Sequence, residues 1–259
     1  MISVAPLLDV NRISISFDGV RVLQDVSLTI PLHQMAGLIG PNGSGKTTLF
    51  NCVSGYYRIS DGHITFDGRA ITGERPHAIA RRGVGRTFQT PTLFADMTVR
   101  ENLLLAAESS NIKGSTLRGL MPAPNRAETA RIVAELLARL DLNDYADVVP
   151  RELPVGIAKL GDLGRALASR PKLLLLDEPA VGLNDSERAR MVELLISLNR
   201  VERLSMLIVD HNVSFVTALC QEITVLASGG VISHGSPAVI RSDPAVIQAY
   251  LGDEAHASA

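Results

Sequence analysis

The sequence predicts an α/β fold in which a largely parallel sheet carries helices on its faces. Two observations lead to this prediction. Short apolar runs, typical of strands buried on both faces, alternate along the chain with helical stretches. A glycine-rich loop of the phosphate-binding kind stands directly between one such run and a helix. The 259 residues, 46% of them hydrophobic, suffice for one large domain or two small ones.

The expected elements follow in chain order. Val26, Leu28 and Ile30 keep the two-residue period of a strand. Further strands are expected at residues 35–39, 173–176, 206–209 and 223–226, with a helix over 46–53. Residues 63–66, the Asp67-Gly68 turn and Ile71 predict a β-hairpin. Strands separated by helices favour parallel pairing.

The middle of the chain is helical in character. Thr98 and Glu101 have the spacing of a capping box, and Asn125 and Glu128 repeat it. One apolar helix face is formed by Ile132, Val133, Leu136, Leu137 and Leu140. Residues 109–124 are rich in Ser, Gly and Pro and predict a loop. We therefore expect a helical subdomain at about 90–153, an α/β core at about 1–89 and 154–251, and a disordered tail at 252–259.

Composition excludes several classes of protein. The formal net charge of -2 argues against a dedicated nucleic-acid binder, which carries a basic excess. Cys52 and Cys220 are too far apart in sequence to indicate a zinc site or a disulfide framework, and we expect two buried, inert thiols in a reducing cytosol. The N-terminus lacks the basic region of a signal peptide. The most apolar stretch, 173–176, is far shorter than the roughly 20 residues of a membrane span, so we expect the chain alone to be soluble.

The glycine-rich loop has the full G-x-x-x-x-G-K-[ST] pattern, from Gly40 to Thr47. Its backbone N–H groups can surround phosphates at a helix N-terminus, where Lys46 reaches the β- and γ-phosphates and Thr47 ligates Mg²⁺. The alternative is a turn without a ligand, but the strand before and the helix after favour nucleotide binding. The predicted nucleotide ligands in this loop are Asn42, Gly43, Ser44, Gly45, Lys46, Thr47 and Thr48.

An acid pair, Asp177 and Glu178, follows the buried strand 173–176. Such a pair alone is more often a solvated turn. Beside an intact phosphate loop, Asp177 is expected to hold the Mg²⁺ shell, and Glu178 to orient or deprotonate the attacking water. The chain therefore hydrolyses a nucleoside triphosphate or descends from proteins that do.

These motifs, with Phe17, Gln89 and His211 in the same order, resemble the ATP-binding subunits of ABC transporters over nearly the whole chain. The resemblance implies a RecA-like core with an antiparallel β subdomain and an inserted helical subdomain. It implies that Phe17 stacks on adenine, that Gln89 senses the Mg²⁺ site and faces a membrane partner, and that His211 contacts the γ-phosphate. Asn184 stands where the family's D-loop usually has Asp.

Four segments resemble the branched-chain amino acid subfamily, namely residues 51–57, 85–89, 178–184 and 249–252. The long loop at 109–124 resembles that of the longer of the system's two ATPase subunits. Related importers carry urea and other small molecules, so the resemblance does not fix the cargo.

One segment departs from the family pattern. Where the family has Leu-Ser-Gly-Gly-Gln, this sequence has Leu153-Pro154-Val155-Gly156-Ile157. The family's serine donates a hydroxyl to the γ-phosphate bound by the opposite subunit, whereas Pro154 has neither a hydroxyl nor an N–H. Near the start of a helix Pro154 is unremarkable, so the segment is expected to keep its shape while losing donors.

The resemblance implies an ATPase that binds ATP and Mg²⁺, with Thr47, Gln89 and Asp177 at the metal. Its expected partners are separate permease subunits, a second ABC ATPase in a heterodimer and, indirectly, a solute-binding protein. Its expected place is the cytoplasmic face of the membrane. One alternative is a chiefly regulatory nucleotide-binding partner with a slow site. A soluble P-loop kinase is disfavoured, because it leaves the helical subdomain, Gln89 and His211 unexplained.

Overall fold

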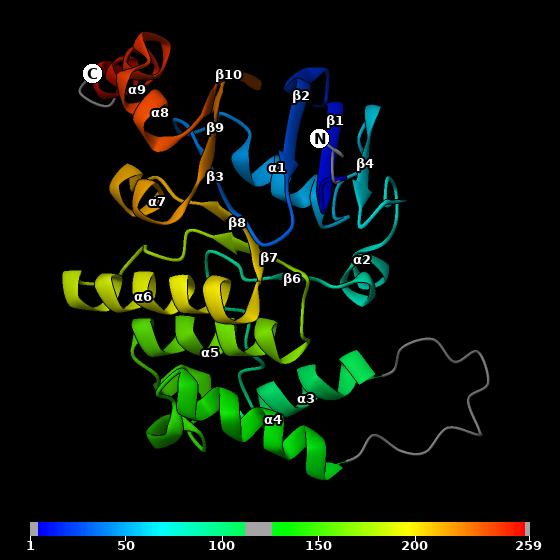
Figure 1. Cartoon of the computed structure of the whole chain (residues 1–259), viewed down its shortest axis with the longest axis vertical. Coiled ribbons are helices and arrows are strands. Elements are labelled where there is room, and N and C mark those ends of the chain that lie inside the picture. Colours follow the sequence, from blue (N-terminus) through cyan, green and yellow to red (C-terminus); the bar gives the residue numbers. More distant parts are fainter. Residues whose placement is uncertain (1–4, 112–125, 257–259) are drawn as a thin grey trace.

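The computed structural model describes residues 5–111 and 126–256 as two sheets with flanking helices (Figure 1). The smaller sheet is antiparallel, in the order β2-β1-β4-β5. Its strands are β1 (Leu8–Phe17), β2 (Val20–Ile30), β4 (Asp61–Phe66) and β5 (Arg69–Ala70). The predicted hairpin is β4 and β5, whose turn residues Asp67 and Gly68 both have positive φ, as a type I′ hairpin turn requires.

The larger sheet has the order β10-β9-β3-β8-β7-β6. Its strands are β3 (Met35–Ile39), β6 (Val84–Arg86), β7 (Leu173–Asp177), β8 (Ser205–Val209), β9 (Glu222–Ala227) and β10 (Gly230–Gly235). All pairings are parallel except that of the edge strand β10 with β9. The largely parallel sheet is therefore confirmed, whereas the antiparallel edge was not foreseen.

Both faces of the larger sheet are covered. Along β7, Leu173 and Leu175 join a core shared with the smaller sheet, while Leu174 and Leu176 join a second core under the helices. The first core also holds the buried face of α1 (Lys46–Val53), which lies between the two sheets (Figure 1). Burial on both faces explains why the central strands are continuous apolar runs.

Five more helices flank the sheets. They are α2 (Pro76–Arg82), α6 (Asp185–Glu202), α7 (Val213–Leu219), α8 (Pro237–Ser242) and α9 (Pro244–His256). Helix α9 continues to His256 and so includes the start of the segment 252–259 that was expected to be disordered; the disorder of this tail stays a prediction, and its last three residues lie outside the described part. Asp243 caps the start of α9 through Ala245 N at 2.8 Å, and Pro244 suits the first helical position. A single Gly252 costs the helix only about 1 kcal/mol and does not end it.

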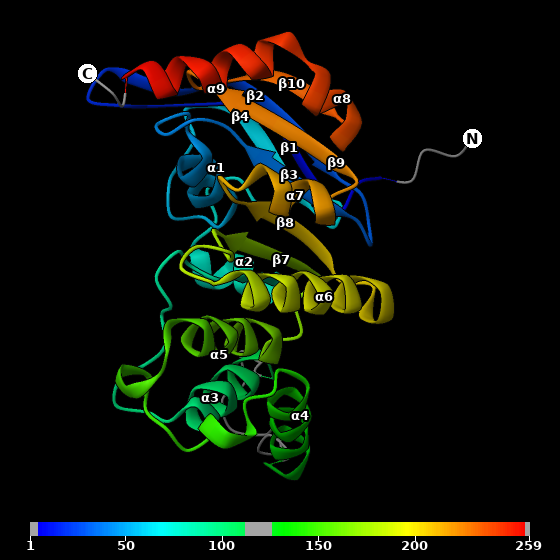
Figure 2. The ribbon, with the colours of Figure 1, turned by 90° about the vertical axis from the view of Figure 1, so that its left-hand side faces the viewer.

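The remaining helices lie at the opposite end of the molecule from α9 (Figures 1 and 2). They are α3 (Val99–Asn111), α4 (Arg126–Arg139), α5 (Val155–Ala168) and two short 3₁₀ turns at Asn143–Tyr145 and Pro150–Glu152. The Thr98–Glu101 capping box is confirmed, because each residue's side chain accepts a hydrogen bond from the other's N–H, at 2.8 and 3.2 Å. Asn125, the cap expected for α4, lies outside the described residues.

The loop expected at 109–124 begins later than predicted. Helix α3 continues to Asn111, and Ser109 fits within it because its hydroxyl donates to Leu105 O at 2.8 Å. The remainder of that segment, 112–125, is outside the described residues.

Helix α5 joins the helical subdomain to the core. A Cβ added to Gly164 would come within 2.9 Å of Leu140 and 3.3 Å of Leu103, and one on Gly161 within 3.1 Å of Leu93. Glycine at these positions lets α5 pack closely on the helical subdomain, while the helix also lies beside α6 (Figure 1). The boundary expected at residue 153 assigns α5 to the core, although α5 packs on both the core and the helical subdomain.

Candidate active site

The motifs predicted from sequence lie at the carboxyl ends of the parallel strands. The phosphate loop follows β3, the acid pair closes β7, His211 follows β8, and Gln89 follows β6. Because β3, β8, β7 and β6 are adjacent and parallel, these four segments emerge at one edge of the sheet, where α/β proteins bind ligands.

The phosphate loop is shaped by its glycines and its lysine. Gly45 has φ +103°, and a Cβ there would come within 2.5 Å of Leu23. The Lys46 ammonium bends back over the loop and donates to Gly40 O at 2.7 Å and Pro41 O at 2.8 Å. The buried hydroxyl of Ser44 has no hydrogen-bond partner among the described residues. A cation and an unsatisfied hydroxyl at one loop fit an anionic ligand.

Helix α1 begins directly after the loop, at Lys46. Its N-cap, Gly45, provides no side-chain oxygen to cap the helix, and a helix N-terminus is a favourable place for a phosphate. Thr47 is exposed and Thr48 half-buried in the same turn. The loop and helix end together have the donor set that ATP phosphates require.

Asp177 is buried against Arg86, which lies in the segment 85–89 and was given no role from the sequence. The carboxylate of Asp177 accepts from Arg86 Nη2 at 3.0 Å, and both side chains are under 10% exposed. Arg86 Nη1 donates to Asn51 and Ser54, and its guanidinium lies 4.6 Å from the centroid of the Phe88 ring. Burial raises the pKa of Asp177, and the hydrogen bond from Arg86 opposes that shift.

Glu178, Gln89 and His211 come together in space. Gln89 Nε2 donates to Glu178 Oε2 at 2.6 Å, and His211 Nδ1 lies 3.7 Å from Glu178 Oε1. Glu178 has φ +49°, and its N–H donates to Val209 O at 2.8 Å. The Gln89 amide nitrogen is thus directed at Glu178, and its predicted contact with Mg²⁺ remains a prediction.

Two aromatic rings stand at the end of β1. Phe17 is 39% exposed and meets Tyr57 edge to face, with ring centroids 5.0 Å apart. An exposed ring held by a second ring can stack on a base. The sequence analysis identified Phe17 and gave Tyr57 no role.

The altered signature segment forms the exposed start of α5. Pro154 is the N-cap, and the first helical hydrogen bond runs from Ala158 N to Pro154 O at 2.9 Å. Pro154 and Val155 are exposed, Leu153 and Ile157 half-buried, and Gly156 buried. A Cβ on Gly156 would come within 2.8 Å of the carboxylate of Glu187, so α5 packs closely on the start of α6 at this glycine.

Comparison with known proteins identifies the family. The model for the ABC transporter family matches residues 23–181. The high-affinity branched-chain amino acid transport ATP-binding protein BraF of Pseudomonas aeruginosa is 36% identical over 252 residues, which cover 96% of this chain and 98% of BraF. The chain belongs to the ABC transporter family. Members of this family bind and hydrolyse ATP to power transport, and this ABC ATPase is an enzyme of that kind.

Other similarities refine the picture of this ABC ATPase. LivG of Salmonella typhimurium, also a branched-chain amino acid transport ATP-binding protein, is 38% identical, with 96% of this chain and 98% of LivG covered. LptB of Haemophilus influenzae, of a lipopolysaccharide export system, is 32% identical at the same coverage. A second family model, of the branched-chain amino acid ATP-binding cassette transporter, matches residues 231–256.

A solved structure confirms the predicted fold class. The ADP conformation of MJ1267, an ATP-binding cassette of an ABC transporter, matches with a TM-score of 0.83 and 30% identity, over 96% of this chain and 100% of that one. ATP-binding subunits of importers in this family act with membrane permeases. Within residues 5–111 and 126–256, this ABC ATPase has no helix long and apolar enough to cross a membrane.

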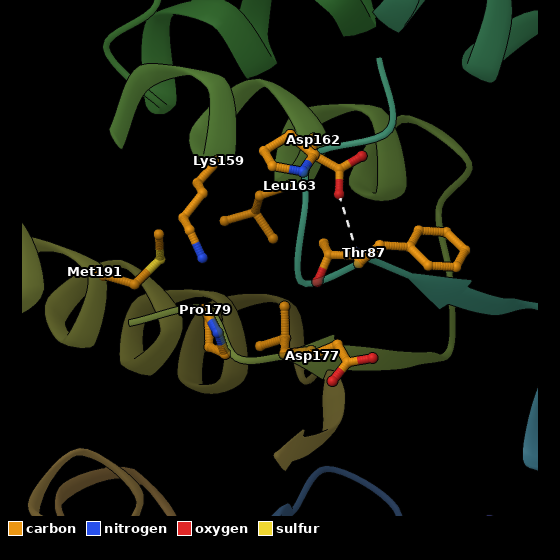
Figure 3. Close-up of a pocket in the computed structure, with 10 residues that line it drawn as sticks. Thr87, Lys159, Asp162, Leu163, Asp177, Pro179 and Met191 are labelled. Carbon is orange, nitrogen blue, oxygen red and sulfur yellow. Dashed lines mark hydrogen bonds between the residues drawn. The ribbon is translucent and has the colours of Figure 1, made fainter. Parts of the chain in front are cut away.

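Sequence analysis missed two charged residues on α5 of this ABC ATPase. Lys159 donates to Glu178 O at 2.7 Å, and Asp162 accepts from Phe88 N at 3.2 Å. Figure 3 shows both side chains projecting from α5 toward the strand ends. Their i, i+3 spacing was the only available signal, and a solvated helix face has the same spacing.

Proposed function

We propose that this ABC ATPase powers the uptake of branched-chain amino acids or related small solutes. Residues 231–256 carry the proposal, because they match the model specific to branched-chain amino acid cassettes. The relatives named for that transport also exceed LptB in identity, at 36–38% against 32%. The ATPase motifs alone fit importer and exporter subunits equally well.

For ATP, we assign phosphate binding to the loop from Asn42 to Thr48 and base stacking to Phe17. Glu178 acts as the general base that takes a proton from the attacking water, and His211 contacts the γ-phosphate. In this structure Gln89 occupies one oxygen of Glu178, at 2.6 Å. An ionised carboxylate has about four acceptor sites on its two oxygens, so Glu178 keeps the capacity to accept the proton of the attacking water while Gln89 holds it in place.

Mg²⁺ fits the same site. Asp177 and Thr47 provide the carboxylate and hydroxyl oxygens that Mg²⁺ prefers, and Gln89 an amide oxygen. Among the described residues, no group of three or more His, Cys, Asp or Glu side chains could hold a metal alone. That suits an ion bound by one or two protein oxygens together with ATP phosphates and water. The bound ion supplies positive charge that neutralises the phosphate oxygens.

A groove between the core and the helical subdomain suits a permease. It has a volume of about 350 Å³ and is lined by residues that include Ala80, Phe94, Leu105, Ala106, Arg165 and Ser169. Phe94 is 57% exposed and lies five residues after Gln89, so a partner seated here can act on the Gln89 loop. We propose that a cytoplasmic segment of the permease binds in this groove, which places the ATPase at the inner face of the membrane.

We further propose that the working unit is a heterodimer with a second ABC ATPase. A solute-binding protein is an indirect partner, which delivers the solute to the permeases. The altered signature supports this assignment, because Pro154, Val155 and Ile157 lack the hydroxyl and amide groups of the family's segment. A partner with an intact signature then completes the site formed by Lys46, Asp177, Glu178 and His211.

Reconstitution tests the proposed function. The chain, its partner ATPase, the permeases and the solute-binding protein are placed in liposomes, and uptake of radiolabelled leucine and of urea is measured with ATP inside or outside. ATP-dependent leucine uptake is the expected result. Urea uptake without leucine uptake would change the cargo, and ATP hydrolysis without uptake of either would contradict the importer assignment. Phe94→Asp is expected to abolish uptake while ATP binding persists.

A further inference from the structure

Lys159 is a buried cation to which the proposed mechanism gives no role. It is 8% exposed, and its one hydrogen bond in the described part of the chain runs to a neutral acceptor, Glu178 O, at 2.7 Å. Burial lowers the pKa of Lys159, against the attraction of Asp210, Glu178, Asp162 and Asp177. A buried lysine whose ammonium group is hydrogen-bonded to a neutral carbonyl stabilises a fold less than a buried methionine of similar volume does.

The acids that face Lys159 are engaged elsewhere. Asp162, on α5 itself, accepts from Phe88 N and Arg165 Nε, and Asp177 accepts from Arg86. Asp210, after β8, accepts from the N–H groups of Ala180 and Asn212. Among the described residues, the hydrogen bond of Lys159 is therefore the one that it donates to the backbone carbonyl of Glu178.

That bond holds a conformation which glutamate seldom adopts. With φ +49°, Glu178 is left-handed, a conformation in which the Cβ of a non-glycine residue comes too close to the following carbonyl oxygen. The conformation persists because both sides of the residue are held: its N–H donates to Val209 O, and its C=O accepts from Lys159. The left-handed backbone in turn sends the carboxylate toward Gln89 and His211. Figure 3 shows the ammonium of Lys159 directed toward the segment at Pro179, just after Glu178.

We propose that Lys159 is a positioning residue for ATP hydrolysis, which holds Glu178 in the left-handed conformation that aims its carboxylate at the attacking water. The inference rests on the proposed role of Glu178 as general base. Lys159 lies on α5, the helix that begins with the signature segment, and α5 packs through Gly156 against Glu187 at the start of α6. Lys159 therefore connects the loop that carries Glu178 to α5, and α5 is also held by its contact with α6.

Lys159→Met tests this role, because methionine keeps the volume and removes the donor. Turnover (kcat) is expected to fall roughly 10- to 100-fold, the scale of a small misplacement of a reacting group. The Kd for ATP should stay within about twofold of wild type, because the phosphate loop is untouched, and the Tm should hold or rise, because a buried charge is gone. Lys159→Arg, which restores a cationic donor, should recover most of the turnover.

Two measurements distinguish a positioning role of Lys159, acting through Glu178, from a merely structural role. Amide hydrogen exchange in the segment 176–184, measured without nucleotide, should speed up in Lys159→Met and not in the matched control Lys172→Met, whose side chain is 55% exposed. Adding Lys159→Met to Glu178→Gln should lower turnover no further, because the two residues act through one carboxylate.

Several results would overturn the proposal. Wild-type turnover and exchange in Lys159→Met would do so, as would a joint loss of Tm and ATP affinity, which marks a merely structural lysine. If Lys159→Met does not fold, Lys159→Leu, which also lacks a donor, takes its place with the same expectations. If Glu178→Gln itself keeps wild-type turnover, the proposed function fails first; if Glu178→Gln is inactive and Lys159→Met is normal, only the role of Lys159 fails.

Discussion

Arg86 and Asp177 form a buried ion pair at the carboxyl edge of the parallel sheet, with Nη2 and Oδ2 3.0 Å apart. Arg86 closes β6 and Asp177 closes β7, and these neighbouring strands pair in parallel. The hydrogen bond from Arg86 holds one carboxylate oxygen of Asp177, Oδ2, in place. The predicted Mg²⁺ ligand is therefore oriented before any nucleotide arrives.

Arg86→Met is expected to destabilise the fold by about 3–5 kcal/mol, because it leaves the buried carboxyl group of Asp177 without its ion-pair partner. Urea unfolding without nucleotide measures the loss. The double variant Arg86→Met/Asp177→Asn should regain part of the stability. Arg12→Met is the control, because the Arg12–Asp25 pair is 74% and 60% exposed and solvent screens it. Equal effects of the two arginine substitutions would contradict the importance of burial.

Glu178→Gln keeps the shape of the side chain and removes the base. ATP binding should persist while turnover falls roughly 10²–10⁴-fold, the range for loss of a general base. Mixed with the partner ATPase, the variant should also accumulate an ATP-bound heterodimer, detectable by size-exclusion chromatography with ATP and Mg²⁺. Turnover near the wild-type rate would show that another group takes the proton.

Lys46→Ala removes the cation of the phosphate loop. Charge-assisted hydrogen bonds contribute about 1.5–3 kcal/mol, so ATP affinity should fall tenfold or more. Isothermal titration measures the affinity, and circular dichroism checks that the fold is intact. Lys172→Ala, at an exposed lysine, should bind ATP as wild type does, and unchanged affinity in Lys46→Ala would contradict the assigned site.

The two cysteines should be inert in the native protein. Cys52 and Cys220 are 5% and 4% exposed, and burial raises the pKa of Cys52 to about 12 and that of Cys220 as well. Because the thiolate is the reactive form, iodoacetamide at pH 8 should modify neither until urea unfolds the chain. Mass spectrometry of intact protein counts the modified thiols, and rapid native labelling of either would contradict the burial described here.

The sequence predicted elements whose signals are local. The Leu173–Leu176 run indicated a strand buried on both faces, and the loop up to Lys46 indicated the start of α1. The start of α9 was missed although it is also local, because Asp243 and Pro244 were not recognised as a helix start. The edge strand β10 has a mixed burial pattern and gave no clear alternation.

The site residues that escaped prediction depend on tertiary packing. Lys159 and Asp162 have the spacing of an exposed polar face, and they are buried only because α5 lies against the loops that follow β6 and β7. The contact between Gln89 and Glu178 joins residues 89 positions apart. Motifs named these two residues, but only the fold shows that Gln89 donates to the carboxylate of Glu178.

The signature segment leads to the last prediction. In the heterodimer that we propose, Pro154, Val155 and Ile157 would face the ATP bound by the partner subunit. Pro154 and Val155 are indeed exposed at the start of α5, where the first-turn N–H groups are the remaining donors. A homodimer carries this donor-poor segment at both sites, whereas a heterodimer with an intact partner has one well-formed site on the phosphate loop of this chain.

The lone chain should therefore hydrolyse ATP slowly, and adding the partner ATPase should raise turnover. The triple variant Pro154→Ser/Val155→Gly/Ile157→Gln should raise the activity of the lone chain, because it returns a hydroxyl and an amide to the segment. Gly156 is left unchanged, because it already matches the family's segment and a Cβ there would come within 2.8 Å of the Glu187 carboxylate. Steady-state phosphate release is measured for the lone chain, for the chain with its partner and for the triple variant. If adding Glu178→Gln to the triple variant removes the gain in turnover, the gain depends on this chain's own catalytic site. If the lone wild-type chain matches the pair and the triple variant gains nothing, backbone N–H groups near Gly156 suffice and the asymmetric assembly is wrong.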